Sequence, residues 1–205
     1  MMLAWFALVA STHFAALLSP GPDFFLLIRA TLLQGRRHAD GCACGIALAN
    51  LLSMALVLGA LHLLPEQGGG LWRGLQWLGG GYFLWLGLQA LAVRRELRMP
   101  EDEAAARGDW RAGLLQGLLA SSLNPKLPIF YAGLFGVLRQ AAMPAWGLAL
   151  SMLWMGLVVL FWDLLLVRLL GREGWRRWLA RRVAWLDRLC GALLLLLGAW
   201  LLLGA

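Results

Sequence analysis

Apolar residues run along this chain in six long stretches, and short gaps between the stretches hold most of the charge. The stretches cover approximately residues 3–28, 41–64, 71–93, 112–138, 144–168 and 186–204. About 20 apolar residues are enough for an α-helix to cross the hydrocarbon core of a bilayer. The pattern therefore predicts an all-α polytopic membrane protein with six transmembrane helices.

The distribution of arginine among the gaps predicts how the spans are oriented. Arginines cluster in the first, third and fifth gaps, whereas the second and fourth gaps hold only Arg73 and Arg139. Basic gaps face the cytoplasm, so both termini are predicted to lie outside it. With 61% hydrophobic and 14% charged residues, the chain is too apolar for a soluble domain. Its net charge of +7 lies in these gaps and suits anionic lipid, with no nucleic acid as a partner.

Two of the apolar stretches are interrupted by residues that break helices. The first contains Ser19-Pro20-Gly21-Pro22-Asp23, and the fourth contains Asn124-Pro125-Lys126. Serine or asparagine followed by proline is typical of an N-cap and a first helical position, so each break should end one half-helix and begin another. Lipid does not tolerate unpaired amides or charges. The breaks are therefore expected to line a cavity enclosed by protein.

The two halves of the chain resemble each other, which predicts an internal repeat. Three sets of positions match at similar offsets: Leu18-Ser19-Pro20 with Leu123-Asn124-Pro125 at 105, Gly45–Ala49 with Gly147–Ser151 at 102, and Gly80 and Gly87 with Gly191 and Gly198 at 111. We expect one transporter domain over residues 1–205, with repeat one at about 1–93, a cytoplasmic linker at about 94–110 and repeat two at about 111–205. Three spans per repeat invert the second repeat. The predicted architecture is two inverted three-helix repeats with broken first and fourth helices, and substrate bound between the repeats.

Candidate site residues come from the breaks and from one asparagine in the second span. The half-helix starts at Ser19, Pro20, Gly21, Pro22, Asn124 and Pro125 expose amides and a positive dipole end, which suit a carboxylate. Asp23 is interpreted as a proton carrier or as the partner of a substrate ammonium; the alternative is a helix cap that never titrates. Lys126 is a candidate carboxylate contact or gating partner, unless it extends to an interface. Asn50 either ties helices together or touches substrate.

Other polar residues in the spans are given structural interpretations. Asp163 lies five residues before Arg168 and is interpreted as an interface anchor or an arginine partner, outside the site. His13 and His62 are isolated in apolar segments and are interpreted as hydrogen-bonded structural histidines; the alternative is a proton relay. Cys42 and Cys44 lack further ligands nearby, so we expect packing residues and no metal.

The motifs together resemble the LysE/RhtB family of amino-acid exporters. The resemblance covers essentially the whole chain and is carried by these segments: Leu18–Asp23, Gly35–Arg37, Gly45–Asn50, Gly80–Gly87 and Asn124–Lys126. It implies a carrier of the bacterial inner membrane that exports amino acids or their derivatives from the cytoplasm and is driven by the proton gradient. The neutral-substrate branch, of the threonine and homoserine type, is the closer match. Leu127-Pro128 departs from the family pattern.

This resemblance implies an amino acid, protons and the lipid bilayer as partners, with no cofactor, for a carrier acting alone or as a homo-oligomer. Two alternatives stand beside it. The chain could export another small solute or a metal ion, or it could be an intramembrane enzyme. It contains neither an H-E-x-x-H nor a G-x-S-x-G motif. We therefore expect a secondary active transporter and not an enzyme.

Overall fold

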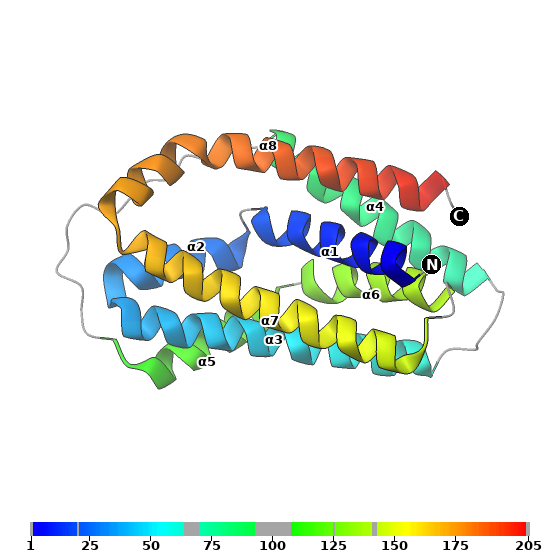
Figure 1. Cartoon of the computed structure of the whole chain (residues 1–205), viewed down its shortest axis with the longest axis horizontal. Helices are drawn as coiled ribbons and strands as arrows, with labels where there is room; N and C mark the ends of the chain where they lie inside the picture. Colours follow the sequence, from blue (N-terminus) through cyan, green and yellow to red (C-terminus); the bar gives the residue numbers. More distant parts are fainter. Residues whose placement is uncertain are drawn as a thin grey trace.

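The computed structural model describes residues 2–19, 21–63, 70–92, 108–124, 126–140 and 143–203, and the elements in these ranges are helices. A π-helical turn, η1 (Ala30–Gln34), continues the second helix. The helices are α1 (Met2–Leu18), α2 (Pro22–Arg29), α3 (Arg36–His62), α4 (Gly70–Ala92), α5 (Trp110–Ser122), α6 (Lys126–Gln140), α7 (Ala145–Leu170) and α8 (Glu173–Leu203). The all-α class is confirmed (Figure 1).

Both predicted breaks divide a helix, but the predicted cap of the first one is wrong: the N-cap of α2 is Gly21 and not Ser19, because Pro22 supplies the first helical position. The first falls between the end of α1 at Leu18 and the start of α2 at Pro22, and the second between the end of α5 at Ser122 and the start of α6 at Lys126. Across the first break the chain bends by 51°. Pro20 and Pro125 themselves lie outside the described residues, as does most of the predicted linker.

Several helices are suited to a membrane. Two of them, α3 and α7, are long and apolar enough to cross it as continuous spans. Up to four spans result if each bent pair counts as one, the pairs being α1 with α2–η1 and the two parts of α8, which meet at 45°. These candidates among the described residues support a multi-pass membrane protein, while six spans in inverted repeats stay a prediction.

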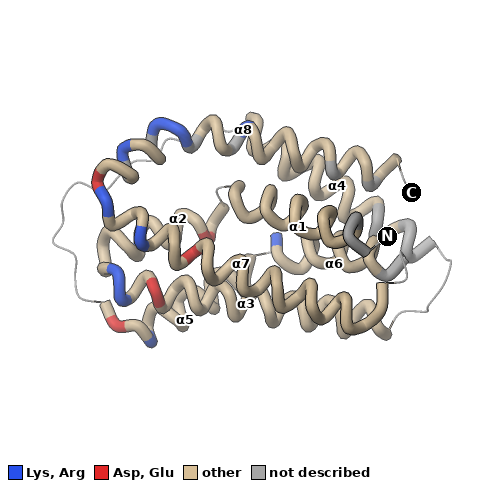
Figure 2. Tube along the Cα trace, viewed as in Figure 1, with Lys and Arg blue, Asp and Glu red and all other residues tan. Residues whose placement is uncertain are grey.

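The helices form an elongated bundle with its charge at one end. Figure 1 shows α4 and α8 along one side, α3, α5 and α7 along the other, and α1, α2 and α6 between them. The two termini lie at the same end of the bundle. Most of the described lysine and arginine residues gather at the opposite end (Figure 2). We call this the basic end.

Glycines bring the backbones of α3 and α5 into direct contact. A Cβ atom added to Gly45 would lie 2.2 Å from the carbonyl oxygen of Leu114, and one added to Gly117 would lie 2.2 Å from that of Cys42. Gly41 and Gly113 are equally crowded, with their nearest atoms at 2.1 Å. Both helices thus present a small-xxx-small face, the arrangement that lets membrane helices approach most closely.

The helices α4 and α8 also meet through two glycines each, and the first of the two on each helix contacts the second on the other. A Cβ on Gly87 would lie 2.7 Å from the carbonyl oxygen of Gly191, and a Cβ on Gly198 would lie 2.8 Å from that of Gly80. The earlier glycine of α4 therefore meets the later glycine of α8. The two helices run antiparallel along this seam.

Two buried apolar clusters lie on either side of the first break. One includes Val9 of α1 with Phe135 and Met155, and the other includes Leu27 of α2 with Val167. The buried residues of α1 belong to one cluster and those of α2 to the other, with Leu17 at the end of α1 packed against the second, so the break falls where one cluster gives way to the other. Polar groups at the break can therefore face a cavity instead of a packed core.

Candidate functional site: a cavity between the two breaks

The two breaks open onto one cavity, which holds about 650 Å³ of empty space, part of it open to the surroundings. Its walls come from α1, α2, α3, α6 and α7. Seven of the predicted site residues line it: Ser19, Gly21, Pro22, Asp23, Asn50, Asn124 and Lys126. The two remaining predicted residues, Pro20 and Pro125, lie outside the described part of the chain. Segments about 100 residues apart in sequence are thus brought together.

Asp23 lies in the first turn of α2, where the helix dipole favours a carboxylate. Its Oδ2 accepts a hydrogen bond from the Ser121 hydroxyl at 3.0 Å. The Asn124 side chain and the charge of Lys126 also act on this carboxylate. The acid of the first break is therefore held by groups of the second break.

Lys126, the first residue of α6, makes the reverse connection. Its Nζ donates to the carbonyl oxygen of Ala16 at 2.9 Å. That carbonyl lies four residues before Pro20, which has no N–H with which to continue the helix. A charged side chain from the second half therefore satisfies a backbone group that the first break leaves open. The predicted alternative, in which Lys126 extends to an interface, is wrong.

Asn124 caps α6, as its sequence context predicts. Its Oδ1 accepts a hydrogen bond from the backbone N–H of Lys126 at 3.0 Å. Asn124 is buried and also faces the cavity. The start of α6, with the positive end of its dipole, is thus fixed against the cavity wall.

Asn50 ties two helices together, the first of its two predicted roles, while its contact with substrate stays a prediction. Its Nδ2 donates to the carbonyl of Ile46 at 2.9 Å, and its Oδ1 accepts from the hydroxyl of Tyr131 at 2.6 Å. The second bond ties α3 to α6, and the buried amide also lines the cavity. Both polar ends of Asn50 are already occupied by protein groups.

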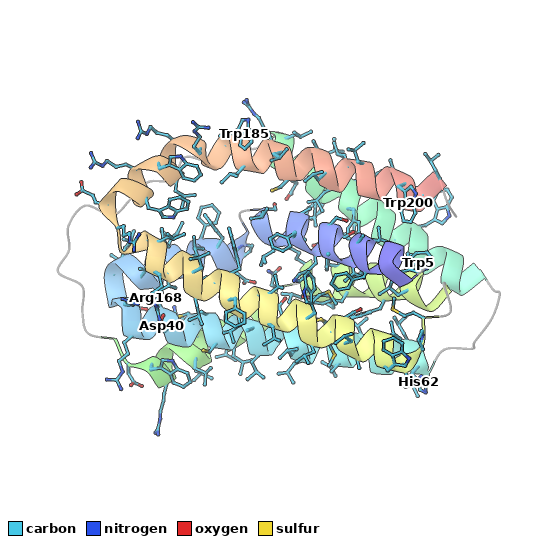
Figure 3. The ribbon with its side chains drawn as sticks, viewed as in Figure 1. Trp5, Asp40, His62, Arg168, Trp185 and Trp200 are labelled. Carbon is cyan, nitrogen blue, oxygen red and sulfur yellow. The ribbon has the colours of Figure 1, made fainter. Side chains whose placement is uncertain are left out.

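Asp163 corrects the sequence prediction. It is 5% exposed and lines the cavity from α7, and its Oδ2 has no hydrogen-bond partner among the described residues. Arg168 instead pairs with Asp40 of α3 (Figure 3). The interpretation as an arginine partner or interface anchor is therefore wrong. Five residues of α-helix rotate a side chain by about 500°, which leaves Asp163 and Arg168 about 140° apart around the axis.

His13 reaches the cavity, but neither of its buried ring nitrogens has a hydrogen-bond partner among the described residues, so the predicted hydrogen-bonded structural role is not confirmed. Its ring is buried, and its centroid lies between 6.1 and 6.4 Å from those of Phe130, Tyr131 and Trp154. Of these rings, His13 of α1 and Phe130 and Tyr131 of α6 line the cavity, whereas Trp154 of α7 does not. A substrate side chain would meet an apolar surface there.

Ser121, Tyr131 and Asp163 are site residues that sequence reasoning did not find. Ser121 could have been found, because it stands four residues before Pro125 as Ala16 stands four residues before Pro20. Tyr131 and Asp163 carry no such signal, since only the assembled bundle shows which face of α6 or α7 meets the cavity. Within the described ranges, no group of three or more His, Cys, Asp or Glu side chains could hold a metal ion.

Comparison with known proteins places the chain among membrane exporters. The profile of the family described as LysE type translocator matches residues 14–205. The threonine efflux protein of Escherichia coli K12 is 30% identical over 200 residues, which cover 94% of each chain. The leucine efflux protein of Klebsiella pneumoniae is 28% identical over 119 residues, 58% of this chain and 56% of the relative. No solved structure matches significantly.

Proposed function

The chain belongs to the LysE type translocator family, and from this premise we propose that it exports neutral amino acids of the threonine type from the cytoplasm. The cavity between the breaks is the substrate site. Threonine efflux proteins that match 94% of the chain favour this substrate class over the leucine type, whose match is shorter.

Opposite charges on one cavity wall carry this proposal. Asp23 and Lys126 both line the cavity, so it can hold the two charges of a zwitterion at once. The ammonium of the substrate binds at Asp23, and its carboxylate binds at the start of α6, near Lys126. A metal ion would gain nothing from Lys126 and would be repelled by it.

Export proceeds by alternating access between two inverted repeats. The crossed glycine contacts support this, because Gly80 and Gly87 match Gly191 and Gly198 at an offset of 111. Exchanging the halves turns the Gly80–Gly198 contact into the Gly191–Gly87 contact, as a two-fold axis between repeats requires.

The two halves differ in the surroundings of a matching pair of glycines, and this asymmetry fits a carrier that is open to only one side of the membrane. A Cβ added to Gly45 would lie closest to the backbone of α5, whereas one added to its counterpart Gly147 would lie closest to side-chain atoms of the neighbouring Met143 and Pro144. The α3–α5 seam therefore closes the bundle near the basic end, where Arg168 and Asp40 also pair. We assign this arrangement to a state closed toward the cytoplasm.

The carrier lies in the bacterial inner membrane with six spans and both termini outside the cytoplasm. The gathering of lysine and arginine at the end opposite the termini supports this orientation (Figure 2). Alkaline phosphatase fused after Ala205 should be active, because this enzyme matures only outside the cytoplasm. An inactive fusion, made at normal levels, would reverse the orientation.

Counterflow tests the function. Proteoliposomes containing the purified chain and loaded with unlabelled L-threonine are diluted into a trace of labelled L-threonine. We expect transient label uptake above that of protein-free liposomes, with competition by L-homoserine and little by L-lysine. Uptake no greater than in protein-free liposomes, with L-threonine, L-homoserine and L-leucine each tested, would refute amino-acid export.

A further inference from the structure

Two acidic side chains face the cavity in different states of hydrogen bonding. Asp23 receives the Ser121 hydroxyl and stands at a helix N-terminus. Asp163 lies two turns before the C-terminal end of α7, is 5% exposed and has an Oδ2 without a hydrogen-bond partner among the described residues. The negative charges of the two residues also act on each other. Among the described residues, a hydroxyl donor and a helix N-terminus stabilise an anion at Asp23, whereas Oδ2 of Asp163 has no donor.

Other groups on the cavity wall do not supply the missing partner. The titratable or charged residues facing it are Asp23 of α2, His13 of α1, and Lys126 and Tyr131 of α6. Lys126 is bonded to Ala16, and Tyr131 to Asn50. Neither buried ring nitrogen of His13 has a hydrogen-bond partner among the described residues, so His13 does not bond Asp163. From α3 the cavity receives Ile46 and Asn50, which do not titrate, and no described residue of α8 lines it.

A buried carboxylate without a partner is costly, whereas a neutral carboxyl group is not. In the empty cavity Asp163 is therefore more stable with a proton. A bound ammonium changes this balance, because its positive charge beside Asp23 also stabilises an anionic Asp163. Binding of substrate in the cavity thus favours loss of the proton from Asp163, and departure of substrate favours its return.

We propose that Asp163 is the residue that carries the counter-proton, binding it when the cavity is empty and releasing it when an amino acid is loaded. This rests on the proposed export function. On loading from the cytoplasm the O–H bond of Asp163 breaks, and its proton passes to cytoplasmic water. After the amino acid leaves outside, a proton from the outer medium rebinds. One proton enters for each amino acid exported, and the substrate itself stays chemically unchanged.

Proton movement and amino-acid movement can be measured separately in proteoliposomes that contain the full chain and a pH-sensitive dye in the lumen. For the wild type, an outward L-threonine gradient should acidify the lumen. In Asp163→Asn this acidification should fall at least tenfold, while exchange of labelled for unlabelled L-threonine continues. Asp163→Glu should restore it. Glu173→Gln is the matched control, since Glu173 is an exposed acid of α8 that pairs with Arg177 and does not line the cavity.

The outcomes separate this proposal from the proposed function. A wild type that exchanges L-threonine without moving protons would refute antiport itself. Full acidification in Asp163→Asn would refute the role of Asp163 alone. Loss of exchange in Asp163→Asn, with an unchanged size-exclusion peak, would also refute it, because Asp163 would then be a substrate-binding residue.

A second measurement uses the unaltered protein and does not depend on a variant that folds. Dicyclohexylcarbodiimide adds to protonated carboxyl groups in apolar surroundings and leaves a stable N-acylurea. Peptide mass spectrometry should find the adduct on Asp163, and L-threonine should reduce it several-fold. Labelling of Asp23 instead, or of neither acid, would overturn the assignment.

Discussion

Ser121 donates a hydrogen bond from its hydroxyl to the carboxylate of Asp23 across 3.0 Å, and so links the end of α5 to the start of α2. Lys126 links the start of α6 to the end of α1 by its 2.9 Å bond to Ala16. Ala16 and Ser121 occupy matching positions, each four residues before the proline of its own break. The charged side chain of each break therefore bonds to the end of the helix that precedes the other break.

The charge of Asp23 should matter more for transport than its bond to Ser121. Asp23→Asn removes the ammonium partner, and hydrogen bonds to charged groups contribute about 1.5–3 kcal/mol. We expect the rate of L-threonine exchange in proteoliposomes to fall at least tenfold, since about 1.4 kcal/mol corresponds to a factor of ten. Ser121→Ala keeps the charge and should reduce the rate only a few-fold. The reverse order of effects would contradict the assigned substrate contact.

Removing the ammonium group of Lys126 should destabilise the fold as well as impair transport. Lys126→Met leaves the half-buried carbonyl of Ala16 without its partner, which costs about 1–3 kcal/mol. Lys126→Arg can still donate to that carbonyl and should lose less. Thermal unfolding in detergent micelles measures the difference. Identical unfolding midpoints for wild type and Lys126→Met would show that the bond does not support α1.

Substitution of the crowded glycines should separate α3 from α5. In Gly45→Ala the new methyl group would meet the Leu114 carbonyl at 2.2 Å, so the helices must move apart. Overpacking of this kind typically costs about 1–3 kcal/mol. Gly59→Ala on the same helix is the matched control, because nothing lies within 4 Å of its Cβ position. Unfolding midpoints in detergent should fall for the first variant and hold or rise for the second.

The two tyrosines of the chain offer another matched pair. Tyr131→Phe leaves the buried Oδ1 of Asn50 unpaired and should lower the free energy of unfolding by about 1–3 kcal/mol. Tyr82 is half-buried and stacks on Trp85, so Tyr82→Phe should change the free energy by no more than about 0.5 kcal/mol. Equal changes in the free energy of unfolding of the two variants, measured by denaturant titration, would show that the Tyr131–Asn50 bond does not stabilise the fold.

The sequence was most informative where backbone chemistry dictates structure. Proline lacks an amide hydrogen, so the positions of both breaks could be predicted from Ser19-Pro20 and Asn124-Pro125, and the helix ends at Leu18 and Ser122 agree. The capping of α6 by Asn124 follows from the same local rule. These features depend on neighbouring residues alone, which is why they did not require knowledge of the tertiary arrangement.

Features that depend on how helices face each other were predicted poorly. Asp163 was assigned by its distance along the chain from Arg168, although positions five apart point in different directions around a helix. The pairing of Arg168 with Asp40 joins residues 128 positions apart, and no local pattern announces it. The Gly41-x-x-x-Gly45 and Gly113-x-x-x-Gly117 pairs were available as a packing signal. They would have predicted two close-packing faces, but not that these faces meet.

The crossed glycine seam between α4 and α8 has a consequence for the origin of the proposed repeat. Exchanging the two halves converts each glycine contact of this seam into the other. The same surface could therefore join two identical three-helix chains, inserted in opposite orientations, into a dimer. Such a dimer would carry the same residues in both of its breaks. In the fused chain, the position that matches Asp23 is Pro128, and the position that matches Lys126 is Gly21. Joining the halves into one chain therefore allows one break to be acidic and the other basic, which a symmetric ancestor could not achieve.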